Sequence, residues 1–298
     1  MDGILVRFLY QSACRQANCH NFLRVPLNKP LFYEPSVYGS PSMELAASTL
    51  HLLDRPLEDI LHQLVTLDVR KIELADSGNH ALNPKRVERL LEFKSSYDIE
   101  FSIHAPYADT NLSADDDLIR EWVLKRIRAS IRFASELDAK CLVVHPGWTT
   151  ATEPFMRGRS WELNIRSLRW LHRYAGDYGV EVLLENVPNS MPYLLVSLDD
   201  FRLFDEEMTP RMDYVLDIGH SNLLGETQGF IDEFGARIKH VHVSDNEGET
   251  DNHFPIGEGT IDWEESIGAM KKIGFKGWIV IESYSKIRES IDYLMHLL

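Results

Sequence analysis

The chain has 298 residues, of which 44% are hydrophobic and 26% are charged, a length that suffices for one large α/β domain with a buried core. The formal net charge of −15 at pH 7 argues against a protein that binds nucleic acid by general neutralisation of phosphates. Three cysteines, Cys14, Cys19 and Cys141, are too few for a disulfide framework, and no apolar stretch reaches the roughly 20 residues of a membrane span. We therefore expect a cytoplasmic protein without a membrane partner.

Residues 1–42 show no regular alternation of strands and helices, and they contain four prolines, Pro26, Pro30, Pro35 and Pro41. Proline removes a backbone hydrogen-bond donor and interrupts helices and sheets. We therefore predict an irregular N-terminal extension over residues 1–42, or a chain whose functional beginning is Met43.

From about residue 43 onward, short β-rich runs alternate with longer segments that have apolar residues three and four apart, which is typical of βα units around a parallel sheet. The predicted strands are 43–49, 70–75, 99–104, 140–145, 180–185, 212–217, 238–243 and 278–282. The predicted outer helices include 56–67, 118–137, 161–178 and 261–273, and two others have predicted N-caps at Asn83 and at either Asp199 or Asp200. Eight strands in ~250 residues predict an α/β protein with a single (β/α)8 TIM barrel over 43–298. A doubly wound open sheet would need fewer strands or a second domain.

Side chains that bind metals fall at the carboxyl ends of the predicted strands. In a TIM barrel these ends lie on one rim, where the loops build the active site. Imidazoles and carboxylates are suitable ligands for zinc, manganese and related divalent ions, and a carboxylate can bridge two ions. A single histidine at a strand end is usually a packed residue, whereas such residues at six consecutive strand ends indicate a metal site. The candidate ligands are His104, His145, Glu185, Asp217, His220, His242, Asp251, His253 and Glu282.

The candidate ligands lie in the motifs HAPY (104–107), HPG (145–147), EN (185–186), DIGH (217–220), HVSD (242–245), DNH (251–253) and IES (281–283), and GEG (257–259) lies between the last two. Each motif alone is weak, but over residues 43–298 the set resembles the xylose-isomerase-like TIM-barrel superfamily. That superfamily includes sugar isomerases and epimerases. It also includes AP endonuclease family 2, to which endonuclease IV, a zinc-dependent abasic-site nuclease, belongs.

The two branches of the resemblance imply different numbers of ions. The sugar epimerases imply one divalent ion, zinc, manganese, magnesium or cobalt, held by Glu185, Asp217, His242 and Glu282, with His220 in contact with the substrate. Endonuclease IV implies three zinc ions. The first would be held by His104, His145 and Glu185, the second by the four residues of the epimerase site, and the third by His220, Asp251 and His253. This chain has all nine residues.

An isomerase or epimerase would act on a sugar or sugar phosphate. The cation would polarise the sugar carbonyl, so that the adjacent C–H proton becomes acidic. Glu185 and Glu282 would then act as general base and acid on opposite faces of a metal-stabilised ene-diolate, and His220 and Trp148 would fix or stack the sugar. Epimerases of this kind place an arginine six residues after the strand-seven histidine, where this chain has Gly248.

A phosphodiesterase would instead use two ions to activate water and a third to stabilise the leaving oxygen, and only then would DNA be the partner. Such an enzyme needs basic side chains and aromatic or apolar wedges to hold a distorted strand. Arg157 and Arg159, in the loop after the fourth predicted strand, are candidate phosphate ligands, and Tyr107 and Trp148 are candidates for stacking on a sugar or a base. Because the chain is acidic and has no clear DNA-binding surface, we favour the isomerase or epimerase. The oligomeric state is left open.

Overall fold

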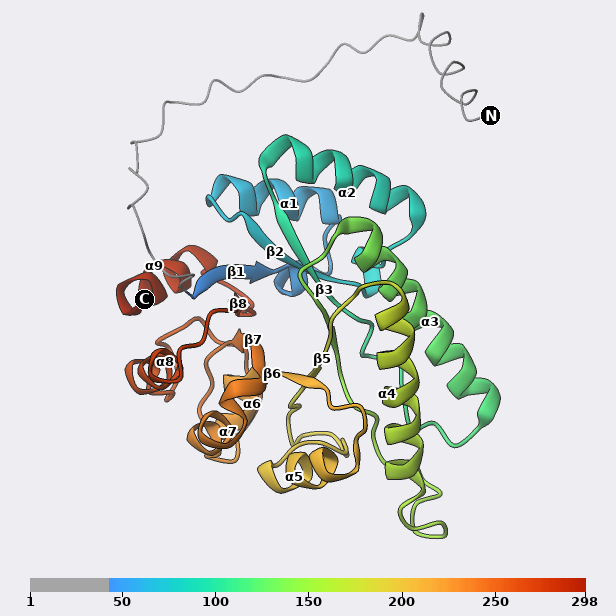
Figure 1. Cartoon of the computed structure of the whole chain (residues 1–298). Helices are drawn as coiled ribbons and strands as arrows, with labels where there is room; N and C mark the ends of the chain where they lie inside the picture. The colour runs from blue at the N-terminus through green and yellow to red at the C-terminus, as the bar shows by residue number, and fades with distance from the viewer. Residues whose placement is uncertain (1–42) are drawn as a thin grey trace, which may run out of the picture. The chain divides into compact units, whose positions relative to one another are not determined.

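The computed structural model describes residues 43–298, so the predicted extension over 1–42, with Cys14 and Cys19, lies outside the described residues. The described chain forms eight parallel strands in a closed barrel (Figure 1). Each strand pairs with the next along the chain, and β8 pairs with β1. The strands are β1 (Glu44–Ser48), β2 (Lys71–Ala75), β3 (Glu100–His104), β4 (Leu142–Val144), β5 (Val182–Glu185), β6 (Asp213–Asp217), β7 (Ile238–Val243) and β8 (Trp278–Ile281). The predicted (β/α)8 barrel is confirmed, and every strand lies inside its predicted run.

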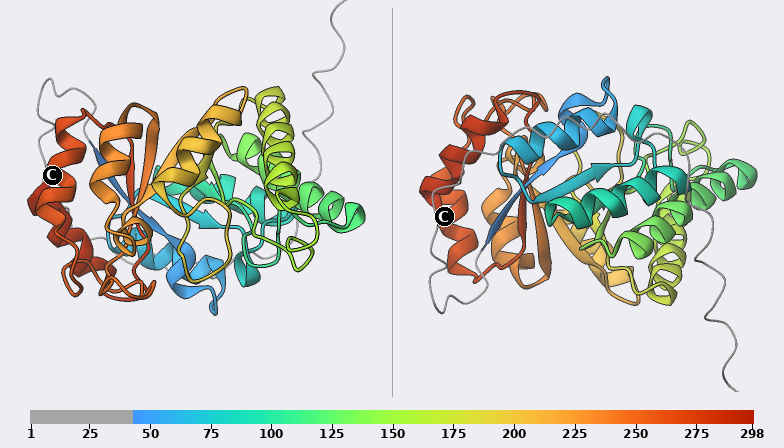
Figure 2. Two further views of the ribbon diagram at one scale, coloured as in Figure 1. Left: turned by 90° about the horizontal axis from the view of Figure 1, so that it is seen from below. Right: turned by 90° about the horizontal axis from the view of Figure 1, so that it is seen from above.

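Helices follow the strands and cover the outside of the barrel, as two further views show (Figure 2). They are α1 (Leu57–Thr66), α2 (Pro84–Tyr97), α3 (Asp117–Leu137), α4 (Arg159–Asp177), α5 (Leu198–Glu207), α6 (Ile218–Asn222), α7 (Thr227–Phe234), α8 (Trp263–Lys272) and α9 (Ile287–Leu297). The four predicted helix ranges correspond to α1, α3, α4 and α8, with ends that differ by no more than two residues. Within residues 43–298, no helix is long and apolar enough to span a bilayer.

Side-chain caps fix where the helices begin. As predicted, Asn83 caps α2: its side chain accepts a hydrogen bond from the backbone N–H of Arg86 at 3.0 Å. The predicted cap of α5 was wrong, because Ser197 is the N-cap and Asp200 is its capping-box partner. The Asp200 carboxylate accepts a hydrogen bond from the backbone N–H of Ser197 at 2.8 Å, so both residues satisfy exposed donors of the first turn.

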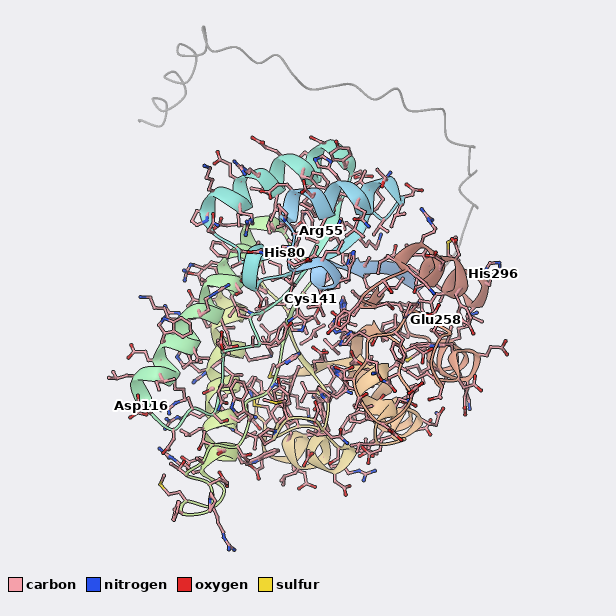
Figure 3. The ribbon with its side chains drawn as sticks, turned by 180° about the vertical axis from the view of Figure 1, so that it is seen from behind. Arg55, His80, Asp116, Cys141, Glu258 and His296 are labelled. Carbon is pink, nitrogen blue, oxygen red and sulfur yellow. The ribbon has the colours of Figure 1, made fainter. Side chains whose placement is uncertain are left out.

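Side chains alternate between two environments along each strand, as an extended backbone requires. Val241 and Val243 of β7 face outward and belong to the large apolar core between the barrel and its helices. Residues at the other parity face the barrel axis, and Figure 3 shows one of them, Cys141, in the interior of the molecule. Two small apolar clusters lie there: Cys141, Val143, Leu183 and Val215 in one, and Ala46, Trp278 and Val280 in the other.

The same alternation points polar side chains into the barrel. His104, Glu185 and Asp217 are the last residues of β3, β5 and β6, and each stands at an inward position. His240 and His242 of β7 are inward residues for the same reason. The carboxyl ends of parallel strands lie at one end of a barrel, so these side chains converge there.

Candidate metal centre

The structure brings all nine candidate ligands together at the carboxyl ends of the strands. They form three groups, and within each group the ligand atoms lie within 4.8 Å of one another. We call them the first group (His104, His145 and Glu185), the second group (Glu185, Asp217, His242 and Glu282) and the third group (His220, Asp251 and His253). The grouping matches the three sets that the resemblance to endonuclease IV implies.

Glu185 belongs to two groups and stands between them. Its Oε2 atom lies 3.1 Å from Nε2 of His104 and 3.1 Å from Nε2 of His145. Its Oε1 atom lies 3.1 Å from Nδ1 of His242. The carboxylate is almost fully buried. It is therefore placed to bridge two cations, or to bind one cation through one oxygen.

Three of the histidines are oriented by backbone carbonyls. Nδ1 of His104 lies 2.8 Å from the carbonyl oxygen of Ala105, and Nδ1 of His220 lies 2.8 Å from that of Asn186. Nδ1 of His253 lies 2.9 Å from the carbonyl oxygen of Glu282. A carbonyl oxygen only accepts, so Nδ1 must carry the proton in each case. Nε2 is then the nitrogen available to a cation, and in all three histidines it points into its group.

The short helix α6 connects the second group with the third. Asp217 is its N-cap, and Oδ1 accepts a hydrogen bond from the backbone N–H of His220 at 2.7 Å. Asn186 fixes Asp217 from the other side, because its side-chain amide donates to the carbonyl of Asp217 at 2.9 Å and accepts from the backbone N–H of Asp217 at 2.7 Å. The position of the Asp217 carboxylate is therefore set by two elements.

The loop between β7 and α8 carries Asp251 and His253. The buried carboxylate of Asp245 organises this loop, since it accepts hydrogen bonds from the backbone N–H of Gly257 at 2.9 Å and from the indole N–H of Trp263 at 2.8 Å. Asp251 Oδ2 lies 3.2 Å from Nε2 of both His220 and His253, so it joins the two imidazoles of the third group.

The charges of the site shift the pKa values of its own groups. Burial alone would lower the pKa of His104, but the hydrogen bond to Glu185 raises it to about 9. Burial would likewise lower the pKa of His220, but the negative charge of Asp217 has the larger effect and raises the pKa of His220 to about 10. Burial raises the pKa of Asp217 to about 6. Against burial, the charge of His242 holds the pKa of Glu185 well below its usual range.

Three carboxylate oxygens of the site are buried and have no hydrogen-bond partner within residues 43–298. They are Oδ2 of Asp217, Oδ1 of Asp251 and Oε1 of Glu282. Burying a carboxylate costs free energy unless its charge is paired or coordinates a cation. Imidazole nitrogens and carboxylate oxygens are the donors that Zn²⁺, Mn²⁺ and related ions take in proteins. The residues present therefore fit a divalent cation.

Aromatic side chains surround the groups. The Tyr107 ring lies 5.2 Å from that of His145, and the Trp148 ring lies 5.9 Å from that of Tyr193. Tyr284 stacks on His253 with ring centroids 4.6 Å apart and is 54% exposed. These rings form apolar surfaces beside a charged centre, an arrangement suited to a small polar ligand with an apolar face.

The two candidate phosphate ligands differ in their surroundings. Arg157 is an exposed loop residue, as predicted. Arg159 was predicted in the same loop, but it is the first residue of α4, because Gly158 with φ of 78° ends the loop. Its guanidinium lies 3.3 Å from a carboxylate oxygen of Asp115 and 3.4 Å from one of Glu162. Arg159 is therefore already paired with two acidic side chains.

The sequence prediction missed four residues of this region: Glu73, His240, Tyr193 and Tyr284. Glu73 is fully buried, and Oε1 lies 2.9 Å from Nε2 of His242. The signal for it was available, because Glu73 stands between outward-facing apolar residues of β2. The two tyrosines gave no such signal. Tyr193 lies in a loop between β5 and α5, and Tyr284 follows β8.

A family model described as xylose isomerase-like TIM barrel matches residues 61–297. The chain is 30% identical over 253 residues to the uncharacterized protein MJ1311 of Methanocaldococcus jannaschii, which covers 84% of this chain and 86% of the relative. It is 22% identical over 239 residues to the fructoselysine 3-epimerase of Shigella flexneri, which covers 76% of this chain and 85% of the relative.

Among solved structures, a D-tagatose 3-epimerase-like protein matches with a TM-score of 0.80 and 29% identity, covering 86% of this chain and 97% of that chain. D-psicose 3-epimerase of Clostridium cellulolyticum H10, solved with D-tagatose, matches with a TM-score of 0.72 and 19% identity. The match covers 86% of this chain and 99% of that chain, and at this identity it supports the fold alone. Since the family model matches most of its length, the chain belongs to the xylose isomerase-like TIM barrel family.

Proposed function

We propose that the protein is a divalent-metal-dependent isomerase or epimerase of a sugar or sugar phosphate. One observation carries the proposal: two buried carboxylates from different strands, Glu185 of β5 and Glu282 after β8, lie in one group near the same nitrogen of His242. Nδ1 of His242 lies 3.1 Å from an oxygen of Glu185 and 3.7 Å from an oxygen of Glu282. Two carboxylates beside one cation site are what proton transfer on both faces of a carbon requires.

The chain's own residues would divide the reaction between them. A bound divalent cation supplies polarisation of the substrate carbonyl, which makes the neighbouring C–H proton acidic. One of Glu185 and Glu282 removes that proton and leaves an ene-diolate, and the other returns a proton to the opposite face. His220 contacts the substrate from the third group, and the rings of Tyr107 and Trp148 exclude water from it.

The names of the relatives support a sugar as the substrate, because they include a fructoselysine 3-epimerase and a D-psicose 3-epimerase. Gly248 stands where the epimerase branch of the resemblance has an arginine, and with φ of 81° the backbone adopts a conformation that a glycine favours. Gly248 offers no side chain to a sugar hydroxyl. We therefore infer that the substrate differs from simple ketoses at the end that faces this loop.

A second candidate function is hydrolysis of a phosphodiester with three zinc ions. The third group favours it, because a one-ion epimerase does not need His220, Asp251 and His253 as a set. Two observations weigh against it. The chain carries a net charge of −15, and the paired guanidinium of Arg159 leaves Arg157 as the exposed one of the two candidate phosphate ligands.

The test combines metal content with solvent exchange. Protein purified without added metal or chelator is analysed by mass spectrometry, and a panel of ketoses and ketose phosphates is incubated with it in D₂O. About one manganese, magnesium or cobalt ion per chain, with deuterium at the carbon beside the carbonyl, would support the proposal. Near three zinc ions per chain, cleavage of abasic DNA and no deuterium in any sugar would overturn it in favour of the hydrolase.

A further inference from the structure

We infer that Glu73 of β2 is a positioning residue that fixes the imidazole of His242, so that Nδ1 of this histidine faces the cation site. The inference rests on the metal site proposed above and concerns a residue outside the nine candidate ligands. The side chain of Glu73 is fully buried in the barrel interior, where it contacts His242.

His242 is oriented the opposite way from three of the other histidines. In His104, His220 and His253 the nitrogen that points into the group is Nε2, and a backbone carbonyl holds Nδ1. In His242 the nitrogen that points into the second group is Nδ1, at 3.1 Å from Glu185. Its Nε2 atom lies 2.9 Å from Oε1 of Glu73, a charge contact outside hydrogen-bond geometry, and neither atom has a hydrogen-bond partner within residues 43–298.

In His242 this role falls to a side chain, since no backbone carbonyl forms a hydrogen bond with Nε2 within residues 43–298. His242 is an inward residue of β7, and the backbone groups of β7 pair with β6 and β8. The carboxylate that lies beside Nε2 comes from another inward position, Glu73 of β2. A carboxylate on the outer nitrogen of a metal-binding histidine fixes the tautomer and raises the basicity of the ligand.

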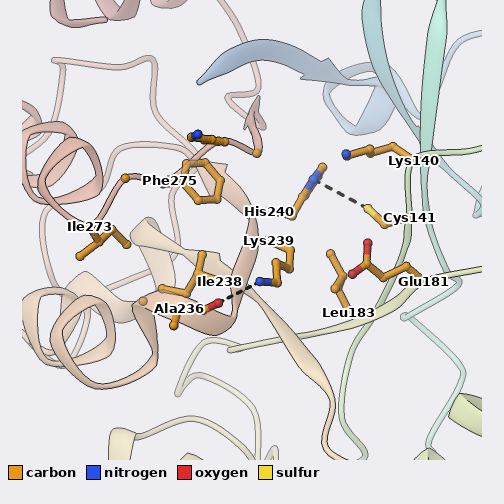
Figure 4. A pocket seen from close by; sticks show the side chains of 14 residues that line it. Lys140, Cys141, Glu181, Leu183, Ala236, Ile238, Lys239, His240, Ile273 and Phe275 are labelled. Carbon is orange, nitrogen blue, oxygen red and sulfur yellow. Dashed lines mark hydrogen bonds between the residues drawn. The ribbon is translucent and has the colours of Figure 1, made fainter. Parts of the chain in front are cut away.

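Glu73 is itself held by two donors. Its Oε2 atom accepts a hydrogen bond from the hydroxyl of Ser102 at 2.9 Å, and Nε2 of His240 lies 3.0 Å from the same oxygen. On the far side of His240, Nδ1 lies 3.8 Å from the thiol of Cys141 (Figure 4). Ser102 and His240 thus hold the Glu73 carboxylate beside His242, and neither of them is one of the nine candidate ligands.

The cavity drawn in Figure 4 lies at the opposite end of the barrel from the candidate site. It measures about 290 Å³ and is lined by residues at the amino ends of β4, β7 and β8, among them Cys141 and His240. His240 therefore separates this cavity from Glu73. Glu73 therefore contacts both His240 and His242.

The experiment compares Glu73→Gln with Ser102→Ala, which removes a hydrogen bond from the same carboxylate but leaves its contact with His242. Zinc affinity is measured by competition with a chromophoric chelator. We expect Glu73→Gln to weaken binding by about 10- to 100-fold, the usual effect of losing such a partner, and Ser102→Ala to change it by less than about 3-fold. Equal losses in the two variants would indicate general loosening of the barrel and would overturn the inference.

A second readout reports the tautomer directly. In zinc-loaded protein labelled with ¹⁵N-histidine, long-range ¹H–¹⁵N spectra distinguish protonated from unprotonated ring nitrogens. We expect His242 to carry its proton on Nε2 in the wild type and to lose this single pattern in Glu73→Gln. An unchanged His242 pattern together with unchanged zinc affinity would overturn the inference.

The remaining outcomes are distinguishable. If Glu73→Gln does not fold, Glu73→Asp keeps the charge but withdraws it from Nε2, and unchanged affinity in that variant overturns the inference. Wild-type protein that binds no divalent ion at the second group removes the proposed function as well. Loss of one whole ion with unchanged affinity for the others would mean that Glu73, His240 and His242 bind a cation themselves, which also overturns the positioning role.

Discussion

The carboxylate of Asp217 accepts a hydrogen bond from the backbone N–H of His220 at 2.7 Å through Oδ1, while its Oδ2 atom is buried without a hydrogen-bond partner within residues 43–298. One oxygen therefore begins the helix that carries His220, and the other is left for a cation. In the proposed metal site, a single side chain would thus have a structural role in the third group and a ligand role in the second.

This division of roles predicts different results for two substitutions of Asp217. Asparagine is as good an N-cap as aspartate, so Asp217→Asn should keep the fold while the second group loses its ion. Asp217→Ala removes the cap as well and should lower the free energy of unfolding by about 1 kcal/mol more. Urea denaturation and metal analysis of both variants check this. Full metal content in Asp217→Asn would exclude Asp217 as a ligand.

Glu282 is the carboxylate that we assign to proton transfer together with Glu185. Glu282→Gln should reduce deuterium uptake into the substrate by at least about 100-fold, since a positioned general acid or base contributes a factor of this order. The matched control is Glu289→Gln, an exposed glutamate of α9. If the two variants exchange deuterium equally well, Glu282 is not the acid or base.

Metal binding should release protons. The pKa of His104 is raised to about 9 and that of His220 to about 10, so both imidazoles carry an extra proton at pH 7. A cation binds only the neutral ring nitrogen, so these protons must leave and the affinity should rise with pH between 7 and 9. Calorimetric titrations of zinc in two buffers with different ionisation enthalpies measure the release. Identical heats in both buffers would contradict the prediction.

If the substrate is a sugar phosphate, we predict that Arg157 binds its phosphate. Because Arg159 is paired with Asp115 and Glu162, Arg157 is the exposed guanidinium near the β4–α4 loop. Arg157→Ala should raise KM about 10-fold for phosphorylated sugars, the effect of one lost charge-assisted hydrogen bond, and should leave neutral sugars unchanged. Arg173→Ala, an exposed arginine further along α4, serves as the control. An equal rise for both substrate classes would remove the phosphate role.

The alternation of side chains along a strand explains how much of the site was predictable. His104, Glu185 and Asp217 are the last residues of their strands, so recognising the strands was enough to place them at one end of the barrel. His253 and Asp251 were predictable only through their motif. Their placement depends on the Asp245 hydrogen bonds within the loop, which no periodicity reveals.

The residues that escaped prediction did so for two reasons. Glu73 has the inward parity of a barrel residue, but it stands in the middle of β2 and not at the carboxyl end, where this fold builds its active site. Tyr193 reaches the mouth because its backbone forms an antiparallel bridge with Trp148, a contact between two loops that are distant in sequence. Loop conformations of this kind depend on tertiary contacts rather than on local sequence.

The second group has one member from each of four neighbouring strands or their ends, β5, β6, β7 and β8. An ion bound there would join half of the closed sheet by ligand bonds in addition to backbone hydrogen bonds. The strands β5 to β8 could not separate from one another until the ion had left. By contrast, β1 and β2 carry none of the nine candidate ligands. Unfolding would then begin at β1 and β2, and the lifetime of the folded protein would depend on the concentration of free metal.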